Sequence, residues 1–388
     1  MSRVDAVAAA MAEADPSSLA AGERLRKTFG PELSAWALTQ VELRRSAAKK
    51  LERADEMWFT RAGMEQATRT DVARWRAARF LEAGVKRVWD VGCGIGSDAM
   101  AFAEAGLEVV AVDADPETVE IASHNLALVG AGPAVLARAE DLDIPETDAV
   151  FLDPARRTSR GRTWNVADFT PPWELVLSYL ESPRFVAVKL GPGVPKELLP
   201  KGMEWCWVSH NGDVVEASLW NRVPERVVAA RVCAQSTSGE AKATEIEQSV
   251  PYRSRLRAGC EVRSPGAYVG EPDGAAIRAG LIAEAVGESE YWLLAEGVAY
   301  VSSDEPIPGG WVTNFKVIDV LPYDRKVLQK YVREQGIGRL EIKKRAIDVD
   351  PAALRKQLKP KGPNTATIIL TPTVDGARAL VVERLALG

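Results

Sequence analysis

The 388-residue sequence predicts an α/β fold built on a doubly wound, mainly parallel sheet that ends in an antiparallel hairpin. Between residues 86 and 190, strand-like segments alternate with helical patterns, as is typical of parallel strands joined by crossover helices. A glycine-rich turn at 90–98 joins the first of these strands to the helix that follows it. Asn211-Gly212 then separates two β-rich runs, and this dipeptide is the strongest short signal for a hairpin.

The individual elements follow from hydrophobic periodicity. Residues 1–85 are predicted to be helical, with apolar residues at helical spacing in 33–41 and 51–58 and an amphipathic helix at 71–81. The sheet domain is predicted over 86–222. Its strands and helices are expected at 85–91, 97–105, 107–112, 116–129, 133–138, 149–153, 173–180 and 185–190, with the hairpin at 205–220.

Two further regions are predicted after the hairpin. Residues 223–315 form a connecting α+β region, with a polar loop at 235–244 and short elements near 275–286 and 292–301. Residues 316–388 form a separate, compact α+β domain. Its strands and helices are expected at 315–320, 324–335, 340–344, 351–358, 365–370 and 380–385.

Composition and charge exclude several classes of protein. No stretch approaches the ~20 apolar residues that span a bilayer, and the N-terminus lacks the pattern of a signal peptide. The four cysteines and two histidines have no metal-ligand spacing, so we expect a cytoplasmic protein without a metal site. The net charge is −5, but residues 316–388 carry 15 Lys and Arg against 8 Asp and Glu, so a tail of +7 follows a body of −12. This asymmetry indicates either a polyanion partner or simply a basic surface.

The glycine-rich turn carries Gly92, Gly94 and Gly96. Glycines allow a tight turn and a close approach of the backbone to a ligand, and the helix that follows presents unpaired N–H groups. Residues 94–99 also satisfy the G-x-G-x-x-A pattern of dinucleotide binding, so the turn alone leaves a nicotinamide cofactor open.

Three acidic residues near this turn decide whether a nicotinamide cofactor fits. Asp90 ends the strand before the glycines, where a carboxylate can accept from an amine or a water but has little use beside a pyrophosphate. Asp113 ends the next strand and is placed to bind two ribose hydroxyls, and Asp141 follows the third strand and can accept from an adenine amine.

The three motifs together, D-V-G-C-G-x-G, V-D-A-D-P and A-E-D, resemble the successive cofactor motifs of class I methyltransferases over roughly residues 86–220. The resemblance implies a Rossmann-like fold and S-adenosylmethionine as the cofactor, held by Asp90, Gly92, Gly94, Gly96, Asp113 and Asp141. In similar proteins a polar segment before the first strand folds over the cofactor, which would place Gln66 of residues 64–68 at the site. A helix-capping loop explains that segment equally well.

Asp153 ends the fourth predicted strand, beside the first strand, and is therefore expected to face the methyl group of the cofactor. In amino-directed methyltransferases a similar acid-Pro-Pro-aromatic segment presents hydrogen-bond acceptors to the substrate nitrogen. Here Pro154 is retained, but Ala155 replaces the second proline and Arg156 replaces the aromatic residue. The predicted catalytic residues are Asp153, Pro154 and Arg156, with a solvated basic loop as the alternative reading of the arginines.

The last ~70 residues resemble the THUMP-like domain at the end of certain bacterial class I methyltransferases, a domain-sized span. The name implies RNA binding. The expected phosphate contacts are Arg156, Arg157, Lys343, Lys344 and Arg345. Strand alternation sends Lys344 to the face opposite Lys343 and Arg345.

The sequence therefore predicts an S-adenosylmethionine-dependent methyltransferase that acts on a base nitrogen of RNA. Two alternatives remain open at this stage: a methyltransferase of a small molecule or protein, which the net acidity favours, and a non-catalytic RNA-binding protein. A nicotinamide oxidoreductase is the least favoured.

Overall fold

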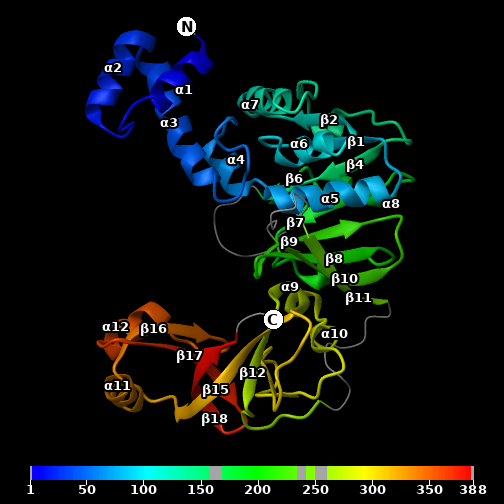
Figure 1. Cartoon of the computed structure of the whole chain (residues 1–388). Coiled ribbons are helices and arrows are strands. Elements are labelled where there is room, and N and C mark those ends of the chain that lie inside the picture. Colours follow the sequence, from blue (N-terminus) through cyan, green and yellow to red (C-terminus); the bar gives the residue numbers. More distant parts are fainter. Residues whose placement is uncertain (1, 157–167, 234–241, 250–259, 386–388) are drawn as a thin grey trace. The chain divides into compact units, whose positions relative to one another are not determined.

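The computed structural model describes residues 2–156, 168–233, 242–249 and 260–385. The chain divides into two compact units (Figure 1). The first unit comprises Met1–Asn211, Glu216–Glu225 and Val232–Ala243, and the second comprises Gly212–Val215, Arg226–Arg231 and Thr244–Gly388.

Among the described residues, nine strands form a mixed sheet in the order β11-β10-β8-β9-β7-β4-β1-β2-β3. The five strands from β7 to β3 run parallel, whereas β9 is antiparallel to β7. This confirms the predicted doubly wound sheet that ends in an antiparallel hairpin. The strands are β1 (Arg87–Val91), β2 (Glu108–Asp113), β3 (Val135–Leu136), β4 (Ala149–Leu152), β7 (Val186–Leu190), β8 (Glu204–His210), β9 (Asp213–Trp220), β10 (Arg226–Cys233) and β11 (Lys242–Ser249).

Helices connect the parallel strands, as the alternating pattern predicted. Besides them, a short two-stranded ladder pairs β5 with β6 and holds the chain after β4 beside residues 169–170. These elements are α5 (Thr70–Glu82), α6 (Ser97–Glu104), α7 (Pro116–Ala127), η1 (Ala139–Asp141), β5 (Ala155–Arg156), β6 (Phe169–Thr170), α8 (Trp173–Glu181) and η3 (Lys196–Leu198).

The N-terminal region is helical over most of its length. Helices α1 (Arg3–Met11), α2 (Leu19–Phe29) and α3 (Pro31–Ala47) share a small apolar core, and α4 (Arg61–Gln66) follows. The helix predicted from the spacing in 51–58 is wrong, because these residues form turns and an extended segment. At the end of this segment the side-chain amide of Asn125 pairs with both backbone groups of Trp58, which satisfies them outside a helix.

The second unit contains a seven-stranded, mostly antiparallel sheet in the order β13-β14-β12-β15-β18-β17-β16. Helices α11 and α12 pack on one face of β16–β18 through a shared apolar core. The elements are β12 (Tyr268–Pro272), α9 (Gly274–Ala279), α10 (Ile282–Val286), β13 (Trp292–Leu293), β14 (Val301–Ser303), β15 (Val312–Pro322), α11 (Arg325–Glu334), β16 (Ile337–Lys344), α12 (Pro351–Leu358), β17 (Asn364–Thr373) and β18 (Gly376–Arg384).

The predicted boundary at residue 316 lies inside β15, which pairs with β12 on one side and with β18 on the other. A single apolar cluster joins Val269 to Phe315 and Ile369 across that boundary. A cut at 316 would therefore divide one sheet and one core. The polar loop expected at 235–244 overlaps the start of β11, and its residues 235–241 lie outside the described part of the chain.

Candidate active site

The glycine-rich turn lines a cavity in the first unit. Gly92, Gly94 and Gly96 have φ of 81°, 55° and 83°, in the left-handed region that favours glycine. The amides of Gly92 and Cys93 both donate to the carbonyl of Val112, at 2.9 and 3.0 Å, which fastens the turn to the end of β2. The turn thus holds its backbone at the carboxyl ends of two neighbouring parallel strands, where ligands bind in such sheets.

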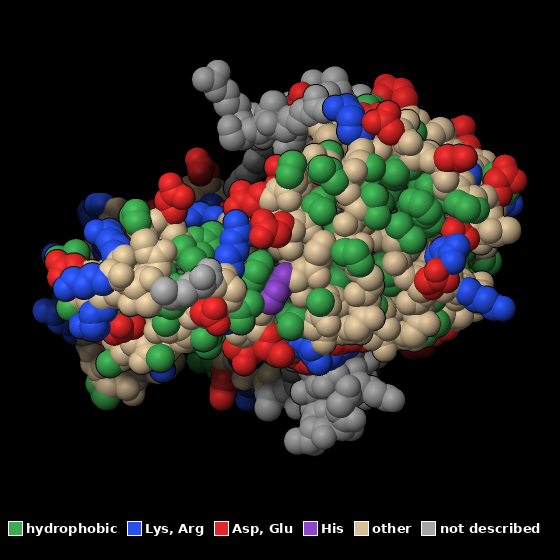
Figure 2. Space-filling view, turned by 90° about the horizontal axis from the view of Figure 1, so that it is seen from above, with side chains coloured by type: hydrophobic (Ala, Val, Ile, Leu, Met, Phe, Trp, Pro, Cys, Tyr) green, Lys and Arg blue, Asp and Glu red, His purple; other side chains and the backbone are tan. Residues whose placement is uncertain are grey.

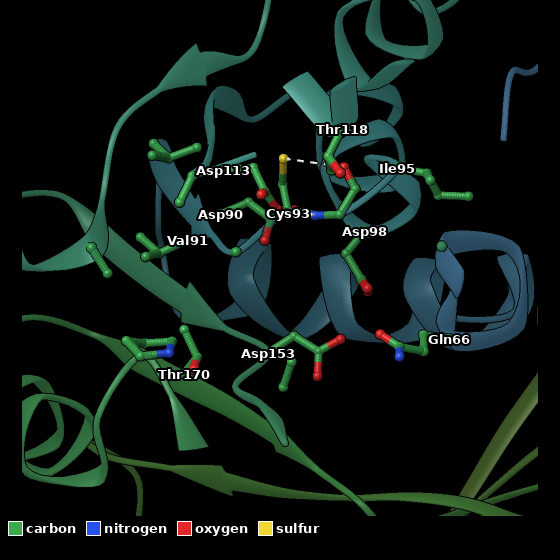
Figure 3. A pocket seen from close by; sticks show the side chains of 18 of the residues that line it. Gln66, Asp90, Val91, Cys93, Ile95, Asp98, Asp113, Thr118, Asp153 and Thr170 are labelled. Carbon is green, nitrogen blue, oxygen red and sulfur yellow. Dashed lines mark hydrogen bonds between the residues drawn. The ribbon is translucent and has the colours of Figure 1, made fainter. Parts of the chain in front are cut away.

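A cavity of about 470 Å³ opens at this edge of the sheet (Figure 3). Most of the residues that the sequence predicted for the cofactor and the chemistry line it, namely Gln66, Asp90, Gly92, Gly94, Asp113 and Asp153. They come from α4, from the turn after β1, and from the ends of β2 and β4. The structure therefore brings together residues that are up to 87 positions apart in the sequence, from Gln66 to Asp153.

Asp90 is the most unusual carboxyl group of the cavity. Its side chain is 1% exposed, and neither of its oxygens has a hydrogen-bond partner among the described residues. Burial, followed by the charges of Asp98 and Asp153, raises the pKa of Asp90 well above its ordinary value. A buried carboxyl without a donor is unfavourable unless a ligand supplies one. The cavity is thus built to receive a hydrogen-bond donor or a positive charge at Asp90.

Asp113 is fixed at the mouth of the cavity. Its Oδ2 accepts from the amide of Gly94 and its Oδ1 accepts from the amide of Asp115, both at 3.0 Å. Each carboxylate oxygen can accept a second hydrogen bond. Asp113 therefore presents two oriented acceptors, the arrangement that binds a pair of neighbouring hydroxyls.

Asp153 and Lys189 form an ion pair on the opposite wall. The ammonium of Lys189, on β7, lies 2.5 Å from Oδ2 of Asp153 and also donates to Oγ1 of Thr68 at 3.1 Å. Burial opposes the charge of Lys189, but Asp153, Asp98 and Glu216 outweigh it and raise the pKa of this lysine above its ordinary value. No hydrogen bond from the described residues reaches Oδ1 of Asp153, whose side chain is 33% exposed. Asp153 thus lines the cavity with one oxygen held by Lys189 and the other without a partner among the described residues.

Below the cavity lies a buried ionic cluster that the sequence analysis did not predict. Arg76, on α5, is fully buried and forms ion pairs with both Asp98 and Glu216. Oδ2 of Asp98 also accepts from Oγ1 of Thr68 at 2.6 Å, which connects this cluster to Lys189. Figure 3 shows Asp98 and Asp153 directed toward the same space. Linked ion pairs and hydrogen bonds thus run from Glu216 on β9 to Asp153 in the cavity wall.

Helix α4 closes one side of the cavity. A Cβ atom at Gly63 would lie 2.3 Å from Cγ2 of Ile95, so only glycine allows this helix to pack on the glycine-rich turn. Lys50 donates to the carbonyls of Glu65 and Ala67, at 3.0 and 3.1 Å, and thereby holds the last turn of α4. Burial is the main reason that the pKa of Lys50 falls to about 8. The segment that carries Gln66 therefore lines the cavity, whereas the N-cap residue of the next helix, α5, is Arg69 and its side chain makes no capping hydrogen bond.

Four predicted site residues lie elsewhere. Asp141 is exposed and is not part of the cavity lining, where its neighbour Glu140 appears instead. Gly96 caps α6 behind the turn, and Pro154 is buried outside the lining. The backbone of Arg156 forms β5, whereas its side chain and the arginines at 157, 160 and 162 lie outside the described residues.

The cavity fits S-adenosylmethionine on two observations. The unpartnered carboxyl of Asp90 suits a cationic ligand, and the paired acceptors of Asp113 suit a ribose. Comparison with known proteins decides the family. An uncharacterized S-adenosylmethionine-dependent methyltransferase from Mycobacterium tuberculosis (strain H37Rv) is 33% identical over 357 residues, which cover 89% of this chain and 95% of the relative. The chain belongs to the S-adenosylmethionine-dependent methyltransferases.

Family models agree with this assignment. A methyltransferase domain matches residues 88–155, a THUMP domain-like model matches 312–384, and a domain of unknown function matches 4–47. A protein of the same description from Mycobacterium tuberculosis (strain CDC 1551) is also 33% identical. A crystal structure of a protein designated a methyltransferase, from Porphyromonas gingivalis W83, has the same fold, with 21% identity, a TM-score of 0.72 and coverage of 99% of this chain and 98% of that one.

Two searches of the described residues gave no site of another kind. None of their helices is long and apolar enough to cross a membrane. Likewise, His, Cys, Asp and Glu side chains in the described ranges form no group of three that could hold a metal ion.

Proposed function

We propose that this methyltransferase modifies a base nitrogen of RNA. The observation that carries the proposal is the asymmetric environment of Asp153, a cavity residue whose Oδ2 is held by Lys189 and whose Oδ1 has no partner among the described residues. An N–H group of the acceptor can donate to Oδ1, which orients the nitrogen lone pair away from the carboxylate.

The protein's contribution to the reaction is alignment. S-adenosylmethionine supplies a methyl group that is already activated by the positive sulfonium. Asp153 accepts from the acceptor nitrogen and takes up its proton as the new bond forms. Lys189 holds the carboxylate in place, because its ammonium lies 2.5 Å from Oδ2 of Asp153.

The THUMP domain-like match over 312–384 and the basic charge of residues 316–388 support an RNA acceptor. Lys344 is exposed and available to a phosphate. Lys343 and Arg345, in contrast, contact Glu271, at 2.5 and 3.8 Å, so part of their charge is neutralised within the second unit. The predicted phosphate contacts thus differ in how accessible they are.

Labelling with methyl-tritiated S-adenosylmethionine tests the proposal. Total RNA from cells that lack the enzyme is incubated with the full-length protein, digested to nucleosides and separated. We expect a labelled nucleoside whose methyl group is on a base nitrogen. Asp153→Ala should abolish labelling while leaving the cofactor Kd within a few-fold, and parallel loss of both would show that Asp153 supports the cofactor instead.

One observation favours a small-molecule or protein acceptor. Phe151 is the single aromatic side chain among the described lining residues, and it is buried, so these residues offer no ring on which a base can stack. In addition, acidic and basic side chains are intermingled over the described surface drawn in Figure 2. Label that stays in the RNA-free fraction of a cell extract would support this alternative and contradict the RNA proposal.

A further inference from the structure

Six exposed basic side chains project from helices α11 and α12 of the second unit. We call them the basic helical face: Arg325, Lys326, Lys330, Arg333, Arg355 and Lys356. We propose that this face binds the phosphodiester backbone of RNA, an inference that rests on the proposed function and assigns its partner to a surface.

The two helices present their charges side by side. The buried residues of α11 are Leu328 and Val332, and those of α12 are Leu354 and Leu358. All four belong to one core with β16–β18, so the helices cover the same face of the sheet. The side-chain amide of Gln329 donates to the carbonyl of Gln357 at 2.8 Å and ties the helices together. Their solvent sides therefore form one surface.

The charges of this face are largely uncompensated. Among the described residues, Lys330 has an ion-pair partner, Glu334 at 3.9 Å, and the other five have none. Two more carboxylates lie near, but Asp324 and Asp350 each cap a helix by accepting from backbone amides. Six cations against three carboxylates leave a net positive surface, and phosphates are the ligands that such a surface binds best.

The strand residues expected to meet phosphates are less suitable. Besides its ion pair with Glu271, Lys343 lies over the ring of Phe315 at 5.4 Å, and Arg345 lies over Tyr300 at 5.3 Å. Binding a phosphate there would break contacts that hold β16 to β12. Among the described residues, the ion pair of the helical face is the one between Lys330 and Glu334 within α11, so this face can bind RNA without rearranging the second unit.

Salt dependence of RNA binding tests this assignment. The full-length protein is titrated with a labelled RNA hairpin at several salt concentrations. The variant K326Q/K330Q/R333Q/R355Q removes four charges from the face and none from the core. Each lost phosphate contact lowers the slope of log Kobs against log salt by roughly 0.7–0.9, so the slope should fall by about 3. A matched control, R26Q/K27Q/R45Q/K49Q, also removes four exposed charges: two from α2, one from α3 and one at Lys49, just after α3. This control should keep the wild-type slope.

The outcomes separate this inference from the proposed function. A reduced slope in the helical variant alone supports the inference. If both variants keep the wild-type slope while RNA is still labelled by the enzyme, the inference is overturned and the proposed function stands. If the wild-type protein neither binds the hairpin in a salt-dependent manner nor labels RNA, both are overturned. Unchanged S-adenosylmethionine affinity and thermal midpoint in each variant show that the fold is intact.

Discussion

Replacing Arg76 with methionine should severely destabilise the first unit. The side chain of Arg76 is fully buried, pairs with Asp98 and Glu216, and lies over the ring of Phe151 at 4.7 Å. Methionine fills a similar volume but leaves two buried carboxylates without a cation. Removing one partner of a buried ion pair costs about 3–5 kcal/mol. Since domains are stable by only about 5–15 kcal/mol, this is a large fraction of the total.

The loss of unfolding free energy in R76M should depend on pH. Burial already raises the pKa of Glu216 above its ordinary value of 4.5, and Arg76 is the largest opposing influence. Without Arg76 that pKa rises further. A carboxyl whose pKa is higher in the folded state binds more protons when folded, so stability falls as the pH rises above 4.5 toward the folded-state pKa. The deficit of R76M should therefore be larger at pH 8 than at pH 5.

Urea unfolding of the full-length protein, followed by circular dichroism and by loss of cofactor binding, measures this deficit. The double variant R76M/E216Q is the control, because it leaves one unpaired carboxylate instead of two, and it should recover part of the loss. An unfolding midpoint for R76M equal to that of the wild type, or a deficit that grows toward acid pH, would refute the reasoning.

Three other predictions concern the cavity. Gly63→Ala should weaken cofactor binding by about 1–3 kcal/mol through overpacking against Ile95, and adding I95A should relieve it in a calorimetric titration. Asp90 has a raised pKa, and a cationic ligand favours its ionised form, so cofactor affinity should rise with pH and binding should release a proton. Calorimetric titration in buffers of different ionisation enthalpy measures this proton release, which should vanish in D90N. Lys189→Met should slow methyl transfer by about 10²-fold at nearly unchanged cofactor Kd, whereas equal turnover would show that Lys189 does not position Asp153.

The sequence was most informative where one short segment contains all parts of a ligand-binding motif. A strand, a glycine-rich turn and a helix N-terminus are contiguous between residues 87 and 104, so their roles follow from local backbone requirements. Asp113 and Asp153 were also predictable, because an acid at the end of a parallel strand necessarily lies at the edge where ligands bind. The place of Asp141 was harder to predict, because within η1 it is Glu140 that belongs to the lining of the cavity, whereas Asp141 is exposed outside it.

The ionic cluster depends on contacts between distant segments, yet it left a signal in the sequence. Arg76 lies four residues after Val72 and four before Phe80, on the apolar stripe of its helix. Lys189 interrupts an otherwise apolar strand in the middle of a sheet. A charge at a position that periodicity assigns to the core requires a buried partner. The partner itself, Glu216, could not be identified without the fold.

One misassignment has the same physical origin. The spacing in 51–58 is helical, but the segment forms turns, and both backbone groups of Trp58 bond to the side chain of Asn125. The boundary at 316 was predicted from the element pattern and from the resemblance of the last ~70 residues, and the THUMP domain-like model begins nearby, at residue 312. Sheet pairing and the shared core of Val269 and Phe315 decide where a domain begins, and neither is visible in local composition.

The buried ionic cluster also explains why a site with a dinucleotide-like glycine pattern suits S-adenosylmethionine. Six carboxyl groups and three cations line the cavity or lie beneath it, namely Asp90, Asp98, Asp113, Glu140, Asp153 and Glu216 with Arg76, Arg138 and Lys189. When all are ionised, the negative charges exceed the positive ones by three, and a pyrophosphate would add to that excess. Because the repulsion acts in a poorly screened, buried environment, it is stronger than at a surface. A sulfonium and an ammonium reduce the excess instead, so the selectivity of the cavity comes from charges that lie outside the glycine motif.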